Sequence, residues 1–126
     1  MDTKLNVKES DAAKKIDLSL VPPAASEEMA LAMMAGLRKP GRWPYNWRTG
    51  GAVKYRTYLA AAKRHIDAIL DGEDDDPEMT EILGRPVTHR GAVLACMAVL
   101  ADVDRYGTLI DDRPSTDYDR ENSKII

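Results

Sequence analysis

The chain of 126 residues contains no phenylalanine and only one cysteine. A single thiol forms neither an internal disulfide nor a zinc site of paired cysteines, so we expect a reducing, cytoplasmic location. Cys96 lies in the apolar run 92–101, which predicts a buried structural thiol. No apolar stretch approaches the roughly 20 residues that cross a bilayer, and a secretory signal is missing, so no membrane partner is expected.

Several catalytic signatures are also missing. The chain has no P-loop, no Rossmann glycine pattern and no Ser-His-Asp arrangement, and it contains no internal repeats. Its length suits a single domain with tails. We predict a flexible N-terminal arm over 1–15, a helical domain over 16–110 and a polar C-terminal tail over 111–126.

Acidic and basic residues nearly balance in number, but they lie in separate stretches of the chain. The chain has 18 Lys and Arg against 21 Asp and Glu, a net charge of -3, which argues against a nucleic-acid partner. Residues 38–66 contain eight basic residues and no acid, whereas residues 71–78 contain six carboxylates in eight positions. The first stretch therefore suits an anion and the second suits a cation.

Apolar residues at three- and four-residue steps predict three helices, over about 26–39, 52–70 and 88–107. Ser26 and Thr88 suit the N-cap positions of the first and the last helix. The predicted fold class is therefore all-α.

The middle of the last helix has no polar face. Residues 92–101 are apolar throughout, so we expect them to be buried on every side. Three helices from one chain hardly suffice to cover such a segment, which predicts a homo-oligomer.

The acidic stretch 71–78 is the strongest sign of chemistry in the sequence. Several carboxylate oxygens in one place are the ligands that Mg²⁺ or Mn²⁺ prefers. Glu27 and Glu28, on the first predicted helix, are candidates to converge on the same ions. The alternative is a solvated acidic loop at the end of a helix.

Each of the two histidines has two possible roles. His65 lies beside the apolar face of the second predicted helix, where it is either a hydrogen-bonded core residue or a group near the substrate. His89 opens the third predicted helix, where it either receives an anion or has a capping or structural role.

The segment 40–51 contains two prolines, three glycines and three aromatic residues, so regular structure is not expected there. Its aromatic residues should pack against the body of the domain. Trp43, Tyr45 and Trp47 either stack on a base or anchor the loop.

Five blocks in a fixed order make the chain recognisable. They are Lys15–Pro23, Gly36–Lys39, Asn46–Arg48, Ala62–His65 and Gly72–Glu78. In this order they resemble the phage dATP/dGTP diphosphohydrolase family, compact relatives of the MazG-like all-α nucleoside triphosphate pyrophosphohydrolases. The resemblance covers about residues 15–105.

The resemblance implies a MazG-like helical bundle completed by oligomerisation, as a dimer or a tetramer. It also implies hydrolysis of a purine deoxynucleoside triphosphate, dGTP or dATP or both, to the monophosphate and pyrophosphate by metal-activated water, with two or more Mg²⁺ or Mn²⁺ ions. The expected role is phage nucleotide-pool control in the cytoplasm of an infected host cell, including the supply of dGMP for 2-aminoadenine nucleotide synthesis.

On this hypothesis Glu73 and Asp76 hold the ions, with help from Glu28 and Glu27. Asp75 is a candidate general base. The residues expected to clamp the phosphates carry a positive charge; they are Lys39, Arg48 and Arg64.

The same hypothesis gives the uncharged residues their roles. Asn46 and Trp47 frame the base or the sugar. His65 donates a hydrogen bond near the phosphates or orients a ligand.

Two alternatives remain open at this point. One is a non-catalytic helical phage protein that regulates a host protein by binding it through the basic, aromatic segment. The other is a phosphatase that removes phosphates one at a time.

Overall fold

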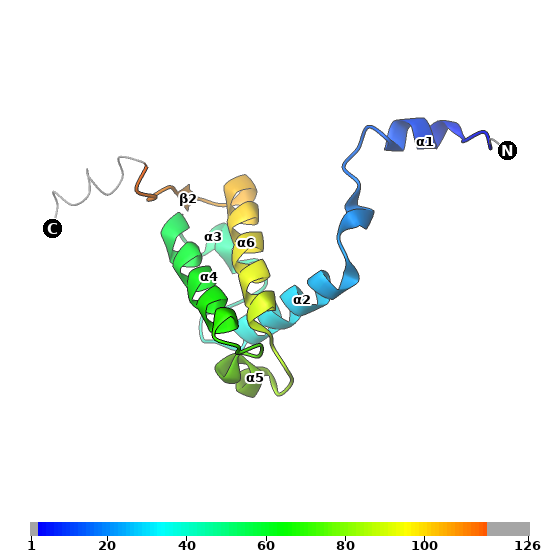
Figure 1. The fold of residues 1–126 in the computed structure, drawn as a ribbon. Helices are drawn as coiled ribbons and strands as arrows, with labels where there is room; N and C mark the ends of the chain where they lie inside the picture. Colours follow the sequence, from blue (N-terminus) through cyan, green and yellow to red (C-terminus); the bar gives the residue numbers. More distant parts are fainter. Residues whose placement is uncertain (1–2, 116–126) are drawn as a thin grey trace.

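The structure of the chain is a computed structural model that describes residues 3–115. The described part is mostly helical, which confirms the predicted class (Figure 1). Its helices are α1 (Val7–Ala12), the 3-10 helix η1 (Leu18–Leu20), α2 (Pro23–Leu37), α3 (Asn46–Thr49), α4 (Tyr55–Leu70), α5 (Pro77–Leu83) and α6 (His89–Tyr106). Two short strands, β1 (Val53–Lys54) and β2 (Leu109–Ile110), pair in parallel.

Helix α2 begins three residues earlier than the N-cap predicted at Ser26, so that prediction was wrong. The helix starts at Pro23, with Pro22 as its N-cap. A proline at the first helical position has a pre-set φ and needs no N–H partner, which makes it a stronger start signal than a serine inside the first turns. The Ser26 N–H instead donates to the carbonyl of Pro22.

Helix α4 was predicted to start near residue 52, but it starts at Tyr55. The preceding residues form β1, which pairs with β2 in the register Val53 to Leu109. The buried Asp112 caps the helix, because its Oδ1 accepts a hydrogen bond of 2.9 Å from the backbone N–H of Arg56. The start of α4 is thus fixed by residues far away in the sequence.

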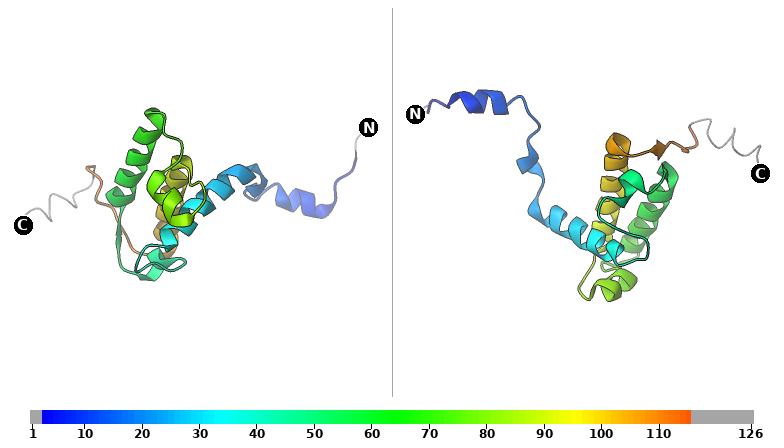
Figure 2. Two further views of the ribbon diagram at one scale, coloured as in Figure 1. Left: turned by 90° about the horizontal axis from the view of Figure 1, so that it is seen from below. Right: turned by 180° about the vertical axis from the view of Figure 1, so that it is seen from behind.

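The predicted bounds of α6 are confirmed. Thr88 is its N-cap and accepts a hydrogen bond of 3.0 Å from the Gly91 N–H, and Gly107 ends it. Helix α4 packs alongside α6, and α2 crosses α6 at an angle, as the views in Figures 1 and 2 show. Gly91 permits a close approach of α2 to α6, since a Cβ at this position would lie 2.2 Å from the carbonyl oxygen of Glu28 on α2.

The middle of α6 is not buried on every side within one chain. Val99, Leu100 and Cys96 are buried, which confirms the prediction for the thiol, and burial raises the pKa of Cys96. Leu94 and Met97, however, are 38% and 39% exposed, because α2 and α4 cover only part of the helix surface.

The loop expected to lack regular structure contains one short helix, α3, which follows Tyr45 in the left-handed conformation. Its anchoring to the body is confirmed by Trp47, whose ring N–H donates to Asp102 Oδ2 at 2.7 Å. Trp43 and Tyr45 remain about half exposed.

The N-terminal segment before α2 leads away from the packed helices, and none of the residues of α1 is buried (Figure 1). The predicted tail enters the structure only over 111–115, where Asp112 is held against α4, and its remainder lies outside the described residues. Among the helices of the described part, none is long and apolar enough to cross a membrane.

Candidate functional site

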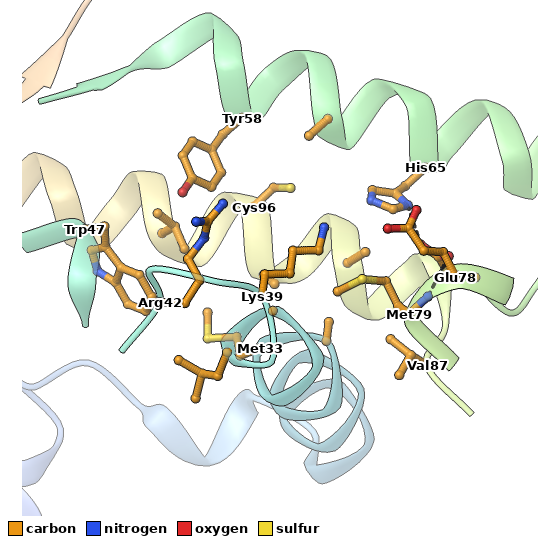
Figure 3. A pocket seen from close by; sticks show the side chains of 18 of the residues that line it. Met33, Lys39, Arg42, Trp47, Tyr58, His65, Glu78, Met79, Val87 and Cys96 are labelled. Atoms are coloured by element: carbon orange, nitrogen blue, oxygen red, sulfur yellow. Dashed lines mark hydrogen bonds and ion pairs between the residues drawn. The ribbon is translucent and has the colours of Figure 1, made fainter. Parts of the chain in front are cut away.

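A cavity of about 440 Å³ lies between α2, α4 and α6 and extends to α5 (Figure 3). Much of its wall is apolar, with Met33 from α2, Met79 from α5 and Cys96 and Val99 from α6. A cavity of this size with an apolar wall and a few polar groups suits a small molecule.

Three cations line the cavity: Lys39, Arg42 and Arg64. Arg42 is held by a hydrogen bond of 2.8 Å from Nη1 to the carbonyl of Pro40. Within residues 3–115, no carboxylate forms an ion pair with any of the three. Positive charges that face a cavity without a neutralising carboxylate favour an anionic ligand.

Aromatic side chains stand at one end of the cavity, where Figure 3 shows Tyr58 and Trp47. Burial raises the pKa of the Tyr58 hydroxyl, which stays protonated. Trp47 is fixed by its hydrogen bond to Asp102. Asn46 beside it donates from its amide to the carbonyl of Trp43 at 2.8 Å, which leaves its side-chain oxygen and its second amide N–H to meet a ligand.

The other end of the cavity carries His65 and Asp76, with His89 behind them. The Nδ1 atoms of His65 and His89 are 2.8 Å apart, and Asp76 Oδ2 is 3.8 Å from His65 Nδ1. His89 is buried, and its Nε2 lies 2.7 Å from Oε1 of Glu73. One ligand atom from each of His65, Asp76 and His89 lies within 4.8 Å of the others, so the three could hold a metal ion.

These contacts indicate the tautomers of the two rings. A carboxylate only accepts, so His89 Nε2–H donates to Glu73 and, in the neutral ring, its Nδ1 accepts from His65 Nδ1–H. Burial lowers the pKa of His65; Asp76 opposes this, while His89 and the cations Arg64 and Lys39 add to it. His65 is therefore neutral at neutral pH, which is the form that binds metals.

The acidic stretch is tied to the start of α6, which brings Asp76 to the histidines. Asp76 N–H donates to the carbonyl of Val87, and His89 N–H donates to that of Asp74, both at 2.8 Å. Asp76 is also the N-cap of α5, where its Oδ1 accepts from the N–H of Met79 at 3.2 Å. Its other oxygen, Oδ2, is the one that faces His65.

Most of the residues that the sequence points to as substrate contacts or catalytic groups do meet in this cavity. Six of them line it, namely Lys39, Asn46, Trp47, Arg64, His65 and Asp76. Glu73 does not line it but contacts His89 from behind, and Asp75 lies exposed in a bridge to Thr88.

Arg48 is not brought to the cavity. It pairs with Asp102 through Nε at 2.7 Å and Nη2 at 2.8 Å, and its guanidinium lies 4.5 Å from the ring centres of both Tyr45 and Tyr106. These contacts anchor α3 on α6.

Glu28 and Glu27 do not join the metal-binding group either. The Glu28 carboxylate accepts from Thr88 Oγ1 at 2.6 Å and from Arg90 Nε at 3.0 Å, and these two partners lower its pKa. Glu27 is exposed on α2.

Four contributors were missed from the sequence. His89 was left between an anion-binding and a structural role, and Arg42, Tyr58 and Glu78, which line the cavity, were not assigned to the site. Tyr58 stands seven residues before His65, two turns of α4, so the helical period could have placed both on one face. No local signal joins His89 to His65, because their contact depends on the packing of α4 against α6.

A helical domain with a cation-lined cavity, and with a group at one end that could hold a metal ion, fits a metal-dependent hydrolase of a phosphorylated small molecule. The family described as dATP/dGTP diphosphohydrolase, N-terminal, matches residues 6–113, and the chain therefore belongs to this family. Membership implies a nucleotide pyrophosphohydrolase activity. No curated protein and no solved structure gives a significant match.

Proposed function

We propose that the chain hydrolyses a purine deoxynucleoside triphosphate, dGTP or dATP or both, to the monophosphate and pyrophosphate in the cavity between α2, α4 and α6. One observation carries the proposal. The cavity combines three cations that pair with no carboxylate of residues 3–115, namely Lys39, Arg42 and Arg64, with the group of His65, Asp76 and His89 at its end, in a chain of the dATP/dGTP diphosphohydrolase family.

The side chains at the two ends of the cavity suggest how the nucleotide is oriented in it. The base and sugar lie toward Trp47 and Tyr58, where an aromatic face supports stacking on a purine. The triphosphate extends toward His65, past Lys39, which Figure 3 shows between the two ends of the cavity. Arg64 and Asp76 also line the cavity. Asn46 and Trp47 frame the base end.

The clamp for the phosphates is formed by Lys39 and Arg64. Arg42, rather than Arg48, is the third cation in the cavity, and Figure 3 shows it beside Tyr58, toward the base end. Arg48 would have to leave Asp102 and two aromatic rings to reach a phosphate. Arg42 already lines the cavity and gives up only one hydrogen bond to a backbone carbonyl.

The reaction requires divalent cations, Mg²⁺ or Mn²⁺ and two or more of them, and the residues at the end of the cavity fit such ions. Asp76 offers its free oxygen beside the two imidazoles, and Glu73 lies next to His89. Bound ions lower the pKa of water and stabilise the charge that develops on the α-phosphate. Asp75, exposed in the adjoining loop, is the candidate general base.

Glu28 and Glu27 take a lesser part in this proposal. Glu28 would have to exchange Thr88 and Arg90 for an ion, and its present contacts hold α2 against the start of α6. Glu27 has an exposed carboxylate that remains available to an ion brought by the nucleotide.

The proposal includes a homo-oligomer, a dimer or a tetramer. Leu94 and Met97 of α6 and Met34 of α2 are 38%, 39% and 45% exposed, and a second copy is the partner that would bury them. Met97→Glu places a charge in this surface, so light scattering should show a smaller species than for the unaltered chain. An unchanged mass would remove this surface from the interface.

The biological role that we propose is nucleotide-pool control in a phage-infected host cell, including the supply of dGMP for 2-aminoadenine nucleotide synthesis. The family match supports the nucleotide hydrolysis on which this role depends.

The activity is tested by incubating the chain with dGTP, dATP and the pyrimidine nucleotides, with Mn²⁺, with Mg²⁺ and with chelator. The expected result is metal-dependent release of pyrophosphate from a purine nucleotide. Orthophosphate as the first product would indicate a phosphatase instead, and no turnover of any nucleotide would favour a non-catalytic interaction protein.

A further inference from the structure

We propose that His65, His89 and Asp76 form a centre for one divalent first-row transition ion, such as Mn²⁺, Co²⁺ or Ni²⁺, in preference to Mg²⁺. Glu73 acts from behind as a positioning residue for His89. This inference deepens the proposed function and rests on it for its catalytic meaning, but the binding of the ion is a property of the chain without nucleotide.

The donor atoms favour a transition ion. Two of the three ligand groups are imidazoles, and only Asp76 supplies oxygen. Imidazole nitrogen suits the first-row transition ions, whereas Mg²⁺ prefers oxygen and keeps several of its waters. A site built for Mg²⁺ alone would gain little from two histidines turned toward each other.

The spacing of the nitrogens is that of adjacent ligands on one ion. His65 Nδ1 and His89 Nδ1 are 2.8 Å apart. With metal–nitrogen bonds of about 2.1 Å, two ligands at a right angle are about 3.0 Å apart, and tetrahedral neighbours are about 3.4 Å apart. The observed separation is close to the right-angle value, so the two nitrogens lie near enough to each other to bind one ion.

The same separation also suits a hydrogen bond between two neutral rings. The ion-free and the ion-bound states differ in the position of one proton on His65. Without an ion, the Nδ1 proton of His65 points at His89. With an ion, this proton must be on His65 Nε2 so that both Nδ1 lone pairs are free. His89 keeps its tautomer in both states, because Glu73 accepts from its Nε2–H.

Glu73 stands where an outer carboxylate stands in many metal–histidine sites. Its Oε1 is 2.7 Å from the Nε2 of His89, and the His89 ring is buried, so both the tautomer and the ring orientation are fixed. The Glu73 carboxylate accepts a hydrogen bond from His89. We therefore assign the direct contacts with the ion to Asp76 and the two histidines.

The experiment is a titration of the metal-stripped full chain with Co²⁺ in the absence of nucleotide, followed by its visible absorption and by calorimetry. We expect one Co²⁺ per chain, bound at least about 100-fold more tightly than Mg²⁺ measured by competition. His65→Gln and His89→Gln should each lower the Co²⁺ affinity by at least about 100-fold.

Glu73 is tested by two variants that separate positioning from charge. Glu73→Ala should weaken Co²⁺ binding about 10- to 100-fold, as loss of an outer partner does, and Glu73→Gln should restore part of it because an amide oxygen still accepts from His89. Glu81→Gln, an exposed carboxylate on α5, is the matched control and should bind as the unaltered chain does. Circular dichroism shows that each variant is folded.

Two results would overturn the inference: Mg²⁺ competing on equal terms with Co²⁺, or folded histidine variants that bind Co²⁺ with unchanged affinity. Tight Co²⁺ binding without pyrophosphate release from any nucleotide would leave this centre standing and remove the proposed function. Pyrophosphate release that neither histidine substitution changes would leave the proposed function standing and remove the catalytic role of this centre.

Discussion

The contact between α2 and α6 predicts opposite effects for the same substitution at two glycines. A Cβ at Gly91 would lie 2.2 Å from the carbonyl oxygen of Glu28, and this oxygen belongs to the backbone of α2 and cannot turn aside. At Gly36, near the end of α2, nothing lies within 4 Å of an added Cβ. Gly91→Ala should therefore destabilise the fold, whereas Gly36→Ala should stabilise it.

The magnitudes follow from the two environments. A carbon and a carbonyl oxygen need about 3.3 Å, so Gly91→Ala must separate the helices by about 1 Å. Overpacking of this kind lowers the free energy of unfolding by about 1–3 kcal/mol. Because the group that it meets is rigid backbone, we expect a value near the upper end of this range. An alanine in place of a helical glycine gains about 0.5–1 kcal/mol when no clash occurs.

Urea unfolding followed by circular dichroism measures both variants, and Gly36→Ala is the matched control. Because Gly91 lies two residues after His89, Gly91→Ala should also weaken Co²⁺ binding while the chain remains folded. Equal stabilities for the two variants would refute the close packing of α2 on α6 described above.

Two further predictions concern charged side chains. Hydrogen bonds from Arg48 and Trp47 lower the pKa of Asp102 from 3.8 to about 2, so its stabilising effect is complete above pH 4 and is lost as the pH falls toward 2. Asp102→Asn should therefore be less stable than the unaltered chain at pH 5, with the difference shrinking toward pH 2 in thermal melts, and a difference independent of pH would contradict this. Arg64→Met should weaken nucleotide binding about tenfold or more, because one charge-assisted contact to phosphate is lost. The neighbouring exposed Lys63→Met is its control, and equal affinities in calorimetry would remove Arg64 from the clamp.

Local signals predicted those elements whose ends are marked by residues within a few positions of them. Thr88 and Gly107 bound α6 where the sequence indicates, because an N-cap serves the N–H groups just after it. Gly72 follows the end of α4 with a φ of +91°, a conformation that favours glycine. The start of α4 was not predictable, because it depends on the pairing of β1 with β2 and on the cap by Asp112.

The sequence predicted those site residues that lie in the two charged segments. It did not predict contacts between residues that are far apart in the sequence. Lys39, Arg64 and Asp76 line one cavity, and each stood in a charged stretch visible in the sequence. The pairing of Arg48 with Asp102 joins residues 54 positions apart, and no local pattern shows that this cation is already engaged.

Glu28 is a further case, because its partner Arg90 stands 62 positions away. Charge patterns thus indicate which residues can meet a ligand. Tertiary packing decides which of them are free to do so.

The central claim, metal-dependent nucleotide hydrolysis at the end of this cavity, is tested most directly by Asp76→Asn. An asparagine oxygen still caps α5 at the Met79 N–H, so the fold should remain, whereas the anionic oxygen facing His65 is lost. With unchanged folding, the account predicts that pyrophosphate release from dGTP or dATP in the presence of Mn²⁺ falls by at least about 100-fold. A folded Asp76→Asn chain that releases pyrophosphate at the original rate would contradict it.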